Sequence, residues 1–202
     1  MKKCIILSYG PVPTPGNDKV EVGGLRCWGL AKGLANNKNI EITVAYNEQY
    51  RKDEEPSQFE NIKITTWSKG SIQKLIKDFD TIVVSYCMGD LSMEVVESIR
   101  TDQQLILDCY VPIYVEISAR ESDDKEHEYN AFKIEVDRWA KVLKRGDLFL
   151  CANDNQVRFY QGVLASLGRI NPITYGDELI IKVPYGIYEN SPSAKTKPIS
   201  DK

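Results

Sequence analysis

The chain has 202 residues, 42% of them hydrophobic and 27% charged, which is enough to build one α/β domain with a substantial core. Its formal net charge of -3, without a basic stripe, argues against nucleic acid as a partner. No apolar run approaches the ~18 residues of a membrane-spanning helix, and the scattered cysteines, without a C-x-x-C pair, are typical of a reducing compartment. We therefore expect a cytoplasmic protein, with a peripheral position on the inner face of the membrane left open.

The first 35 residues predict a strand, a long loop and a helix. The apolar run at residues 4–7 is typical of a strand that is buried on both faces. Residues 25–35 place apolar side chains at three- and four-residue spacings, as in an amphipathic helix. The connection between them, residues 8–24, is far longer than the ~2–6 residues usual in an α/β unit. Open α/β sheets bind their ligands at the carboxyl ends of strands, so this loop is a candidate binding element.

Gly23 and Gly24, at the end of this loop, are candidates to bind an anion through their backbone amides. Without a Cβ, their backbone amides can approach a ligand closely, and a helix N-terminus favours an anion. Arg26, one turn into the helix, would add a bidentate contact to a phosphate or a carboxylate. The alternative is that the glycines only make a tight entry to the helix and that Arg26 is solvated. The dinucleotide fingerprint G-x-G-x-x-G is absent from this stretch.

Strands and helices alternate along the rest of the chain. Further strands are predicted at 40–45, 62–66, 80–85, 105–108, 148–151 and 179–183; further helices are predicted at 71–77, 91–99, 113–144 with a break near 122–124, and 154–167. Residues 48–60 are expected to form a surface loop. The alternation predicts an α/β fold, a Rossmann-like, mostly parallel twisted sheet with helices on both faces. We expect one domain at 1–188, followed by a linker or tail at 189–202.

Polar or aromatic side chains follow four of the predicted strands, namely Tyr9, Tyr86, Tyr110 and Asn153. In a parallel sheet these strand ends share one edge, so the side chains are predicted to line one cleft. Asp108 ends a buried strand at the same edge and is a candidate to bind a sugar hydroxyl or to act as a base. The alternative is a carboxylate that caps a helix or holds a loop.

Other catalytic arrangements are not supported by the residues present. The single histidine, His127, lies in an acidic stretch that we expect to be exposed, and there is no cysteine cluster. A zinc site or a nucleophile–histidine triad is therefore not expected, and no metal or cofactor is predicted. The phosphate-binding P-loop pattern is absent as well. The tryptophans Trp28, Trp67 and Trp139 are expected in the core or an interface.

Four motifs resemble the N-terminal domain of bacterial glycosyltransferases with two Rossmann-like domains (the GT-B type, group 1). They are residues 23–34, similar to a Gly-Ile-Arg-x-Trp-Glu-Leu-Ala run; 107–112 with Glu116, similar to Asp-Leu-Tyr-Asp-Pro and a later Glu; 149–172, similar to Leu-Cys-Ala-Ser-x-x-Gln-Arg and Gly-Arg-Ile-Asn-Pro; and 183–187, similar to Val-Pro-Asn-Gly. Val111 and Gly29 depart from the acidic residues of that pattern.

The resemblance implies that the chain is the acceptor-binding half of a GT-B enzyme. The complete enzyme would move a sugar from a nucleotide sugar to an acceptor hydroxyl in polysaccharide or glycoconjugate synthesis. The resemblance also implies Asp108 as a catalytic residue and Gly23, Gly24 and Arg26 as donor contacts. The implied substrate contacts are Tyr9, Tyr86, Tyr110, Glu116, Asn153 and Arg158.

The implied partners are a C-terminal domain of the same enzyme, the nucleotide sugar as co-substrate, and a glycan or lipid-linked acceptor. Without that second domain the 202-residue chain is expected to be inactive. A stand-alone α/β module that binds a small molecule or nucleotide is the competing hypothesis. A sugar-nucleotide epimerase is disfavoured because the glycine fingerprint and a Tyr-x-x-x-Lys pair are lacking.

Overall fold

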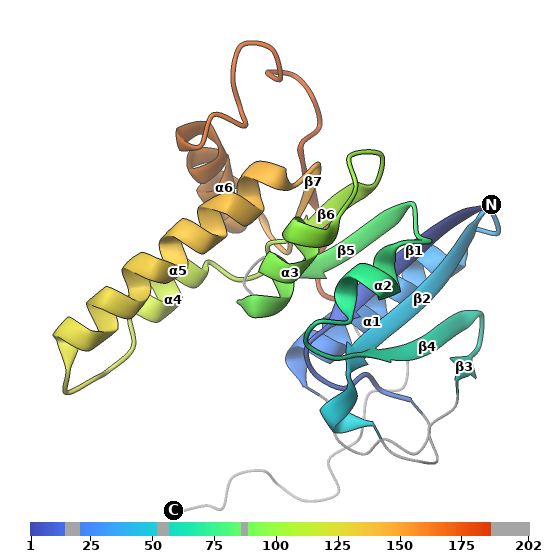
Figure 1. The fold of residues 1–202 in the computed structure, drawn as a ribbon. Coiled ribbons are helices and arrows are strands. Elements are labelled where there is room, and N and C mark those ends of the chain that lie inside the picture. Colours follow the sequence, from blue (N-terminus) through green and yellow to red (C-terminus); the bar gives the residue numbers. More distant parts are fainter. Residues whose placement is uncertain (15–20, 52–56, 86–88, 187–202) are drawn as a thin grey trace, which may run out of the picture.

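The computed structural model describes residues 1–14, 21–51, 57–85 and 89–186, and these residues form one sheet with the strand order β3-β4-β2-β1-β5-β6-β7-β8 (Figure 1). The strands are β1 (Lys2–Ser8), β2 (Ile40–Asn47), β3 (Gln58–Phe59), β4 (Ile62–Trp67), β5 (Thr81–Ser85), β6 (Gln104–Asp108), β7 (Leu148–Cys151) and β8 (Ile180–Lys182). Every described pairing is parallel except the short β3–β4 pair. The predicted Rossmann-like α/β fold is confirmed.

The helices that connect these strands are α1 (Val22–Ala35), η1 (Glu48–Tyr50), α2 (Ile72–Ile76), α3 (Asp90–Ser98), α4 (Ile113–Ser118), α5 (Lys125–Arg145) and α6 (Asp154–Ser166). The predicted break near residues 122–124 is confirmed, since it separates α4 from α5. The expected loop at 48–60 instead contains η1 and β3. These elements are too short to show a hydrophobic period, which explains why the sequence did not predict them.

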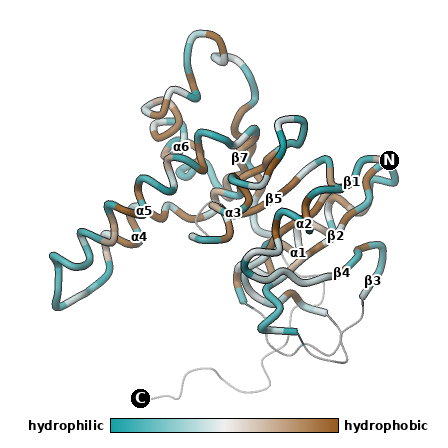
Figure 2. Tube along the Cα trace, in the orientation of Figure 1, coloured by the Kyte–Doolittle hydropathy of each residue, from teal (hydrophilic) through white to brown (hydrophobic). Residues whose placement is uncertain are grey.

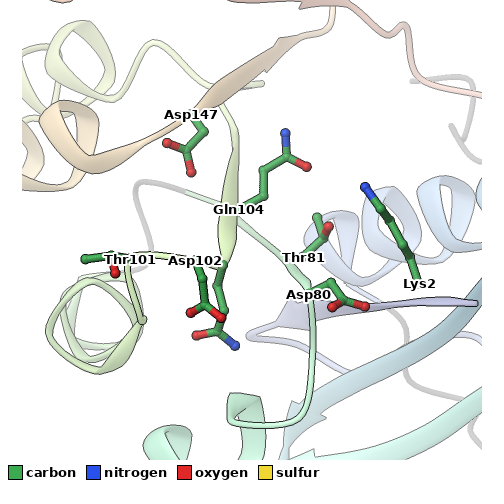
Figure 3. A pocket seen from close by; sticks show the side chains of 8 residues that line it. Lys2, Asp80, Thr81, Thr101, Asp102, Gln104 and Asp147 are labelled. Carbon is green, nitrogen blue, oxygen red and sulfur yellow. The ribbon is translucent and has the colours of Figure 1, made fainter.

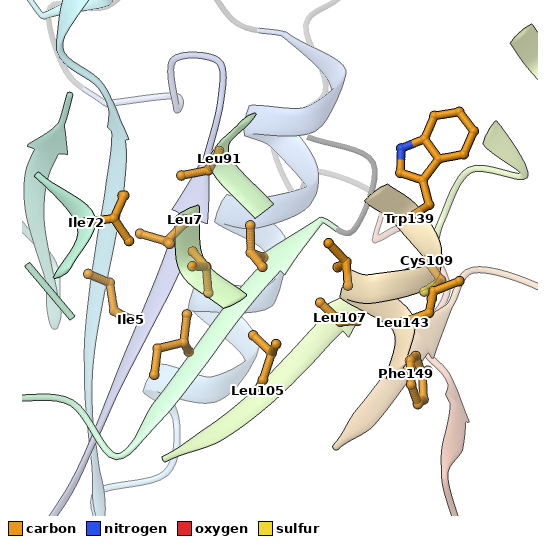
Figure 4. Packing of buried hydrophobic residues seen from close by; sticks show 14 of the residues in the cluster. Ile5, Leu7, Ile72, Leu91, Leu105, Leu107, Cys109, Trp139, Leu143 and Phe149 are labelled. Atoms are coloured by element: carbon orange, nitrogen blue, oxygen red, sulfur yellow. The ribbon is translucent and has the colours of Figure 1, made fainter. Parts of the chain in front are cut away.

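Two hydrophobic clusters lie on the sheet because its strands are apolar on both sides. The larger cluster joins alternate strand residues to α2, α3, α5 and α6, and Figure 4 shows Leu107 and Phe149 beside Leu143 of α5. The smaller cluster lies against α1 and is centred on Trp28, which is 1% exposed. The three tryptophans are all buried, as expected for core residues.

Helices α4 and α5 form an arm that projects away from the sheet in Figure 1. Its tip is hydrophilic in Figure 2, whereas the strands are mostly hydrophobic. Asp124 caps α5 by accepting a hydrogen bond from the His127 backbone amide, 2.9 Å away, and His127 is exposed as predicted. None of the described helices is long and apolar enough to cross a membrane.

Candidate functional site

The carboxyl ends of the central strands meet at one edge of the sheet, as predicted. The chain runs from β1 through α1 to β2 on one side, and β5 pairs with β1 on the other. The strand order therefore reverses between β1 and β5, which is the position where open α/β sheets bind ligands. Ser85 of β5 is in register with Asp108 of β6, which is in turn in register with Leu150 of β7.

The loop after β1 packs tightly against the start of α1. A Cβ added at Gly24 would lie 1.9 Å from the backbone oxygen of Pro11, and one at Gly10 would lie 2.3 Å from the Glu21 carboxylate. Gly24 is therefore needed for packing, which supports the interpretation of the two glycines as a tight helix entry. The N-cap residue Glu21 makes no side-chain capping bond, and α1 has no acidic residue in its first turn. The carboxylate of Glu21 nevertheless lies at the helix N-terminus, where its negative charge offsets part of the partial positive charge of the helix, and an anion contact there stays a prediction.

Arg26 of α1 and Asp108 of β6 form a buried bidentate ion pair. The Arg26 Nε donates to Asp108 Oδ2 and its Nη2 donates to Asp108 Oδ1, each over 3.0 Å. Each residue is only 3% exposed. The alternative of a solvated Arg26 is therefore wrong: its bidentate carboxylate partner belongs to the same chain. Both oxygens of Asp108 accept from Arg26, an arrangement that fits a loop-holding carboxylate.

Burial and charge pairing have opposite effects on the pKa values of the two residues in this ion pair. Burial raises the pKa of the Asp108 carboxyl above its ordinary value, and the hydrogen bonds and charge of Arg26 offset part of that rise. Burial lowers the pKa of Arg26, but the contact with Asp108 outweighs this and the net pKa of the guanidinium is raised. The guanidinium therefore stays protonated at physiological pH. Removing either partner would leave an uncompensated charge in the protein interior.

The remaining donors of Arg26 reach the chain that follows β8. Its Nη1 donates to the carbonyl oxygens of Val183, at 2.6 Å, and Pro184, at 3.0 Å. The guanidinium carbon lies 5.0 Å from the ring centre of Tyr185, a cation–π arrangement. Tyr185 also meets Tyr110 edge-to-face with ring centres 5.8 Å apart. Arg26, Asp108, Tyr110 and Tyr185 thus form one continuous cluster.

The other predicted site residues lie apart from this cluster or engage other groups. Tyr9 packs against Tyr50 and Trp67 on the β2–β4 side of the edge. Asn153 is the N-cap of α6, as predicted, and accepts from the Gln156 amide over 3.0 Å.

Two further predicted contacts are exposed: Glu116 lies on α4 and Arg158 lies on α6. No described contact joins Glu116 or Arg158 to the Arg26–Asp108 pair. Tyr86 lies outside the described residues.

Sequence reasoning missed Tyr185 and Gln156 as members of this edge. The Gln156 amide nitrogen donates to the Tyr110 carbonyl over 2.6 Å, and its Oε1 accepts from the Ala152 amide over 2.7 Å. Gln156 therefore ties the chain after β6 to the chain after β7. Tyr185 lies two residues after the last predicted strand, and this position was the available signal because that strand ends at the same edge.

A separate hollow of about 490 Å³ lies at the opposite, amino edge of the sheet (Figure 3). Its carboxylates hold the backbone together: Asp80 accepts from the Lys3 amide and Asp147 from the Leu105 amide, each over 2.7 Å. Asp102 pairs with Arg100. These engagements explain the hollow as a structural feature. Among the described residues, no group of three or more His, Cys, Asp or Glu side chains is placed to hold a metal ion.

Comparison with known proteins finds no protein family whose model matches this chain, and no curated protein that matches it. The geometry of the carboxyl edge and the motifs described above therefore carry the functional argument.

Proposed function

We propose that this chain is the acceptor-side domain of a cytoplasmic glycosyltransferase of the GT-B type, which transfers a sugar from a nucleoside diphosphate to an acceptor hydroxyl in polysaccharide or glycoconjugate synthesis. The observation that supports this most is the carboxyl edge at the reversal of strand order. Helix α1 begins at this edge without a side-chain capping bond. Arg26 of the same helix donates hydrogen bonds to the chain that leaves β8.

In this proposal the start of α1 interacts with the leaving diphosphate. Negative charge builds on that group as the glycosidic bond to it breaks, and preorganised amide donors stabilise such charge. The amide of Gly23 would act in this way, whereas Gly24 is buried against Pro11 and holds the start of the helix in place. A second Rossmann-like domain would bind the nucleotide, so the 202-residue chain alone is expected to be inactive and to bind nucleotide sugars weakly.

The acceptor, a glycan or a lipid-linked sugar, would contact side chains on the same edge. Tyr9 and Tyr110 follow β1 and β6, while Asn153 is the N-cap of α6 and Arg158 lies in its second turn. Asp108 would act mainly through Arg26, because that residue occupies both of its oxygens.

A charge substitution at Val22 tests the diphosphate site in the complete enzyme encoded by the gene. Val22 is the first residue of α1 and is 66% exposed, so it tolerates a polar replacement. Val22→Asp should stabilise the helix but repel a diphosphate, which should lower kcat/KM for the nucleotide sugar roughly fivefold, the equivalent of about 1 kcal/mol. Val22→Asn is the uncharged control and should retain nearly normal kinetics.

The outcomes separate the proposal from its competitor. A complete protein that shows no transfer with any nucleotide sugar and acceptor, yet binds a nucleotide tightly, would favour the stand-alone binding module. Transfer by the 202-residue chain alone would contradict the assignment of donor binding to a second domain. Equal kinetics for Val22→Asp and Val22→Asn would remove α1 from the diphosphate site.

A further inference from the structure

Arg26 connects three segments that are far apart in the sequence. Its hydrogen-bond partners are 82 residues away at Asp108 and 157 and 158 residues away at Val183 and Pro184. Regular β8 ends at Lys182, just before these two residues. The contacts therefore lie where the chain leaves the sheet, which we name the exit segment, Val183–Tyr185.

The shape of the guanidinium explains how one side chain makes these contacts. Arginine presents its donors as a rigid planar fork. Asp108 occupies the side formed by Nε and Nη2, and this fixes the rotation of the plane. Nη1 is then directed at two successive carbonyl oxygens, those of Val183 and Pro184. Successive carbonyls of an extended strand point to opposite sides, so their convergence on one nitrogen fixes a bend in the chain.

The exit segment follows a short strand and makes further contacts of its own. Strand β8 has only three residues and lies at the end of the sheet order, beside β7. The Val183 amide donates to the Cys151 carbonyl over 2.7 Å, and Tyr185 packs on Arg26 and Tyr110. Val183 is half-buried and Pro184 is exposed, while their hydrogen bonds to Arg26 are partly buried. A short terminal strand of this kind opens easily unless its end is fixed.

We propose that the Arg26–Asp108 pair is a latch that fixes the direction in which the chain leaves the carboxyl edge. Arg26 is the positioning residue, and Asp108 orients its guanidinium. The latch is independent of the proposed function, since it concerns the path of this chain and not the chemistry at the edge. Any segment that continues from Tyr185 would start from a defined direction because of it.

The test is residue-resolved amide hydrogen exchange on the 202-residue chain. The double variant Arg26→Met, Asp108→Leu replaces the ion pair with apolar side chains of similar size, an exchange that buried pairs often tolerate. We expect exchange of the Val183 amide to accelerate by about tenfold or more, the effect of losing one buried charge-assisted hydrogen bond. The amides of β1 and β5 should keep their protection.

Two single variants separate the latch from general stability. Arg26→Lys keeps a positive charge beside Asp108 but lacks the planar set of donors. The Val183 amide should therefore lose its protection from hydrogen exchange in this variant as well. Lys182→Ala is the matched control, because it removes the exposed pair with Asp154 from the same strand and should leave Val183 unchanged.

Unchanged Val183 exchange in the double variant, or full protection in Arg26→Lys, would overturn the latch. If the double variant does not fold, Arg26→Lys is decisive by itself: loss of Val183 protection with a protected β1 supports the proposal, and normal protection refutes it.

Discussion

Two glycines of α1 offer a matched test of how the loop after β1 is packed. Gly24 lies in the first turn of the helix, and a Cβ there would lie 1.9 Å from the Pro11 backbone oxygen. Gly29 lies in the middle of the same helix, is exposed, and would place its Cβ in open space. Glycine to alanine substitutions at these positions therefore make the same chemical change in opposite surroundings.

The expected magnitudes follow from these contacts. Relieving the overlap at Gly24 requires the Pro11 backbone to move by roughly 1 Å, and forced repacking of this kind costs about 1–3 kcal/mol. Since the obstacle is backbone, we take the upper value and subtract about 1 kcal/mol for the better helix propensity of alanine. Gly24→Ala should lower the free energy of unfolding by about 2 kcal/mol, or the Tm by about 4–8 °C. Gly29→Ala should raise the free energy of unfolding by about 0.5–1 kcal/mol.

Urea and thermal unfolding, followed by circular dichroism, measure both variants under identical conditions. The two substitutions are expected to change the free energy of unfolding in opposite directions. A Gly24→Ala protein as stable as Gly29→Ala would show that the approach of Gly24 to Pro11 is not a feature of the folded chain, and the geometry assigned to the loop would be wrong.

Two further predictions concern buried groups. Tyr46 is 1% exposed, and its hydroxyl has no hydrogen-bond partner among the described residues. Tyr46→Phe should therefore be neutral or stabilising by up to about 1 kcal/mol in urea unfolding, and a clear loss of stability would contradict this. The control Tyr160→Phe loses the bond to the Val111 carbonyl and should cost about 1 kcal/mol. Burial raises the pKa of the Cys4, Cys27 and Cys151 thiols to about 12. The neutral thiols therefore contribute fully to the free energy of unfolding below the unfolded thiol pKa of about 8.5, and this contribution is lost as the pH rises toward 12. Iodoacetamide at pH 9, followed by peptide mass spectrometry, should leave these three thiols unmodified in the native protein and modify them in urea; native alkylation would contradict the assigned burial.

Much of the fold was readable from local patterns. The apolar run in β1 and the three- and four-residue spacing of apolar side chains in α1 each show which side of a short segment is buried. Each pattern can be recognised within its own segment, without knowledge of the rest of the fold. The N-cap at Asn153 and the stop at Gly168, where φ is +72°, are likewise local. The small elements η1 and β3 escaped prediction because they depend on pairing with β4 and on turn geometry.

The site was only partly readable. The shared edge followed from the alternation of strands and helices, so Asp108 and Tyr110 were correctly placed at the same edge. Their partners were not readable. Arg26 was expected to be solvated or to contact a ligand, yet it is buried against Asp108, and nothing near Arg26 in the sequence indicates a partner 82 residues away.

By itself, the sequence determined which segments are strands and helices, and therefore the Rossmann-like class and the edge at which polar residues gather. These properties depend on the spacing of apolar residues over short segments, which can be read directly from the amino-acid sequence. Only the tertiary structure decided that Arg26 serves Asp108, Val183 and Pro184 at once. A charge buried in a protein takes whichever opposite charge and carbonyls the fold brings within reach, and that choice depends on distances in space.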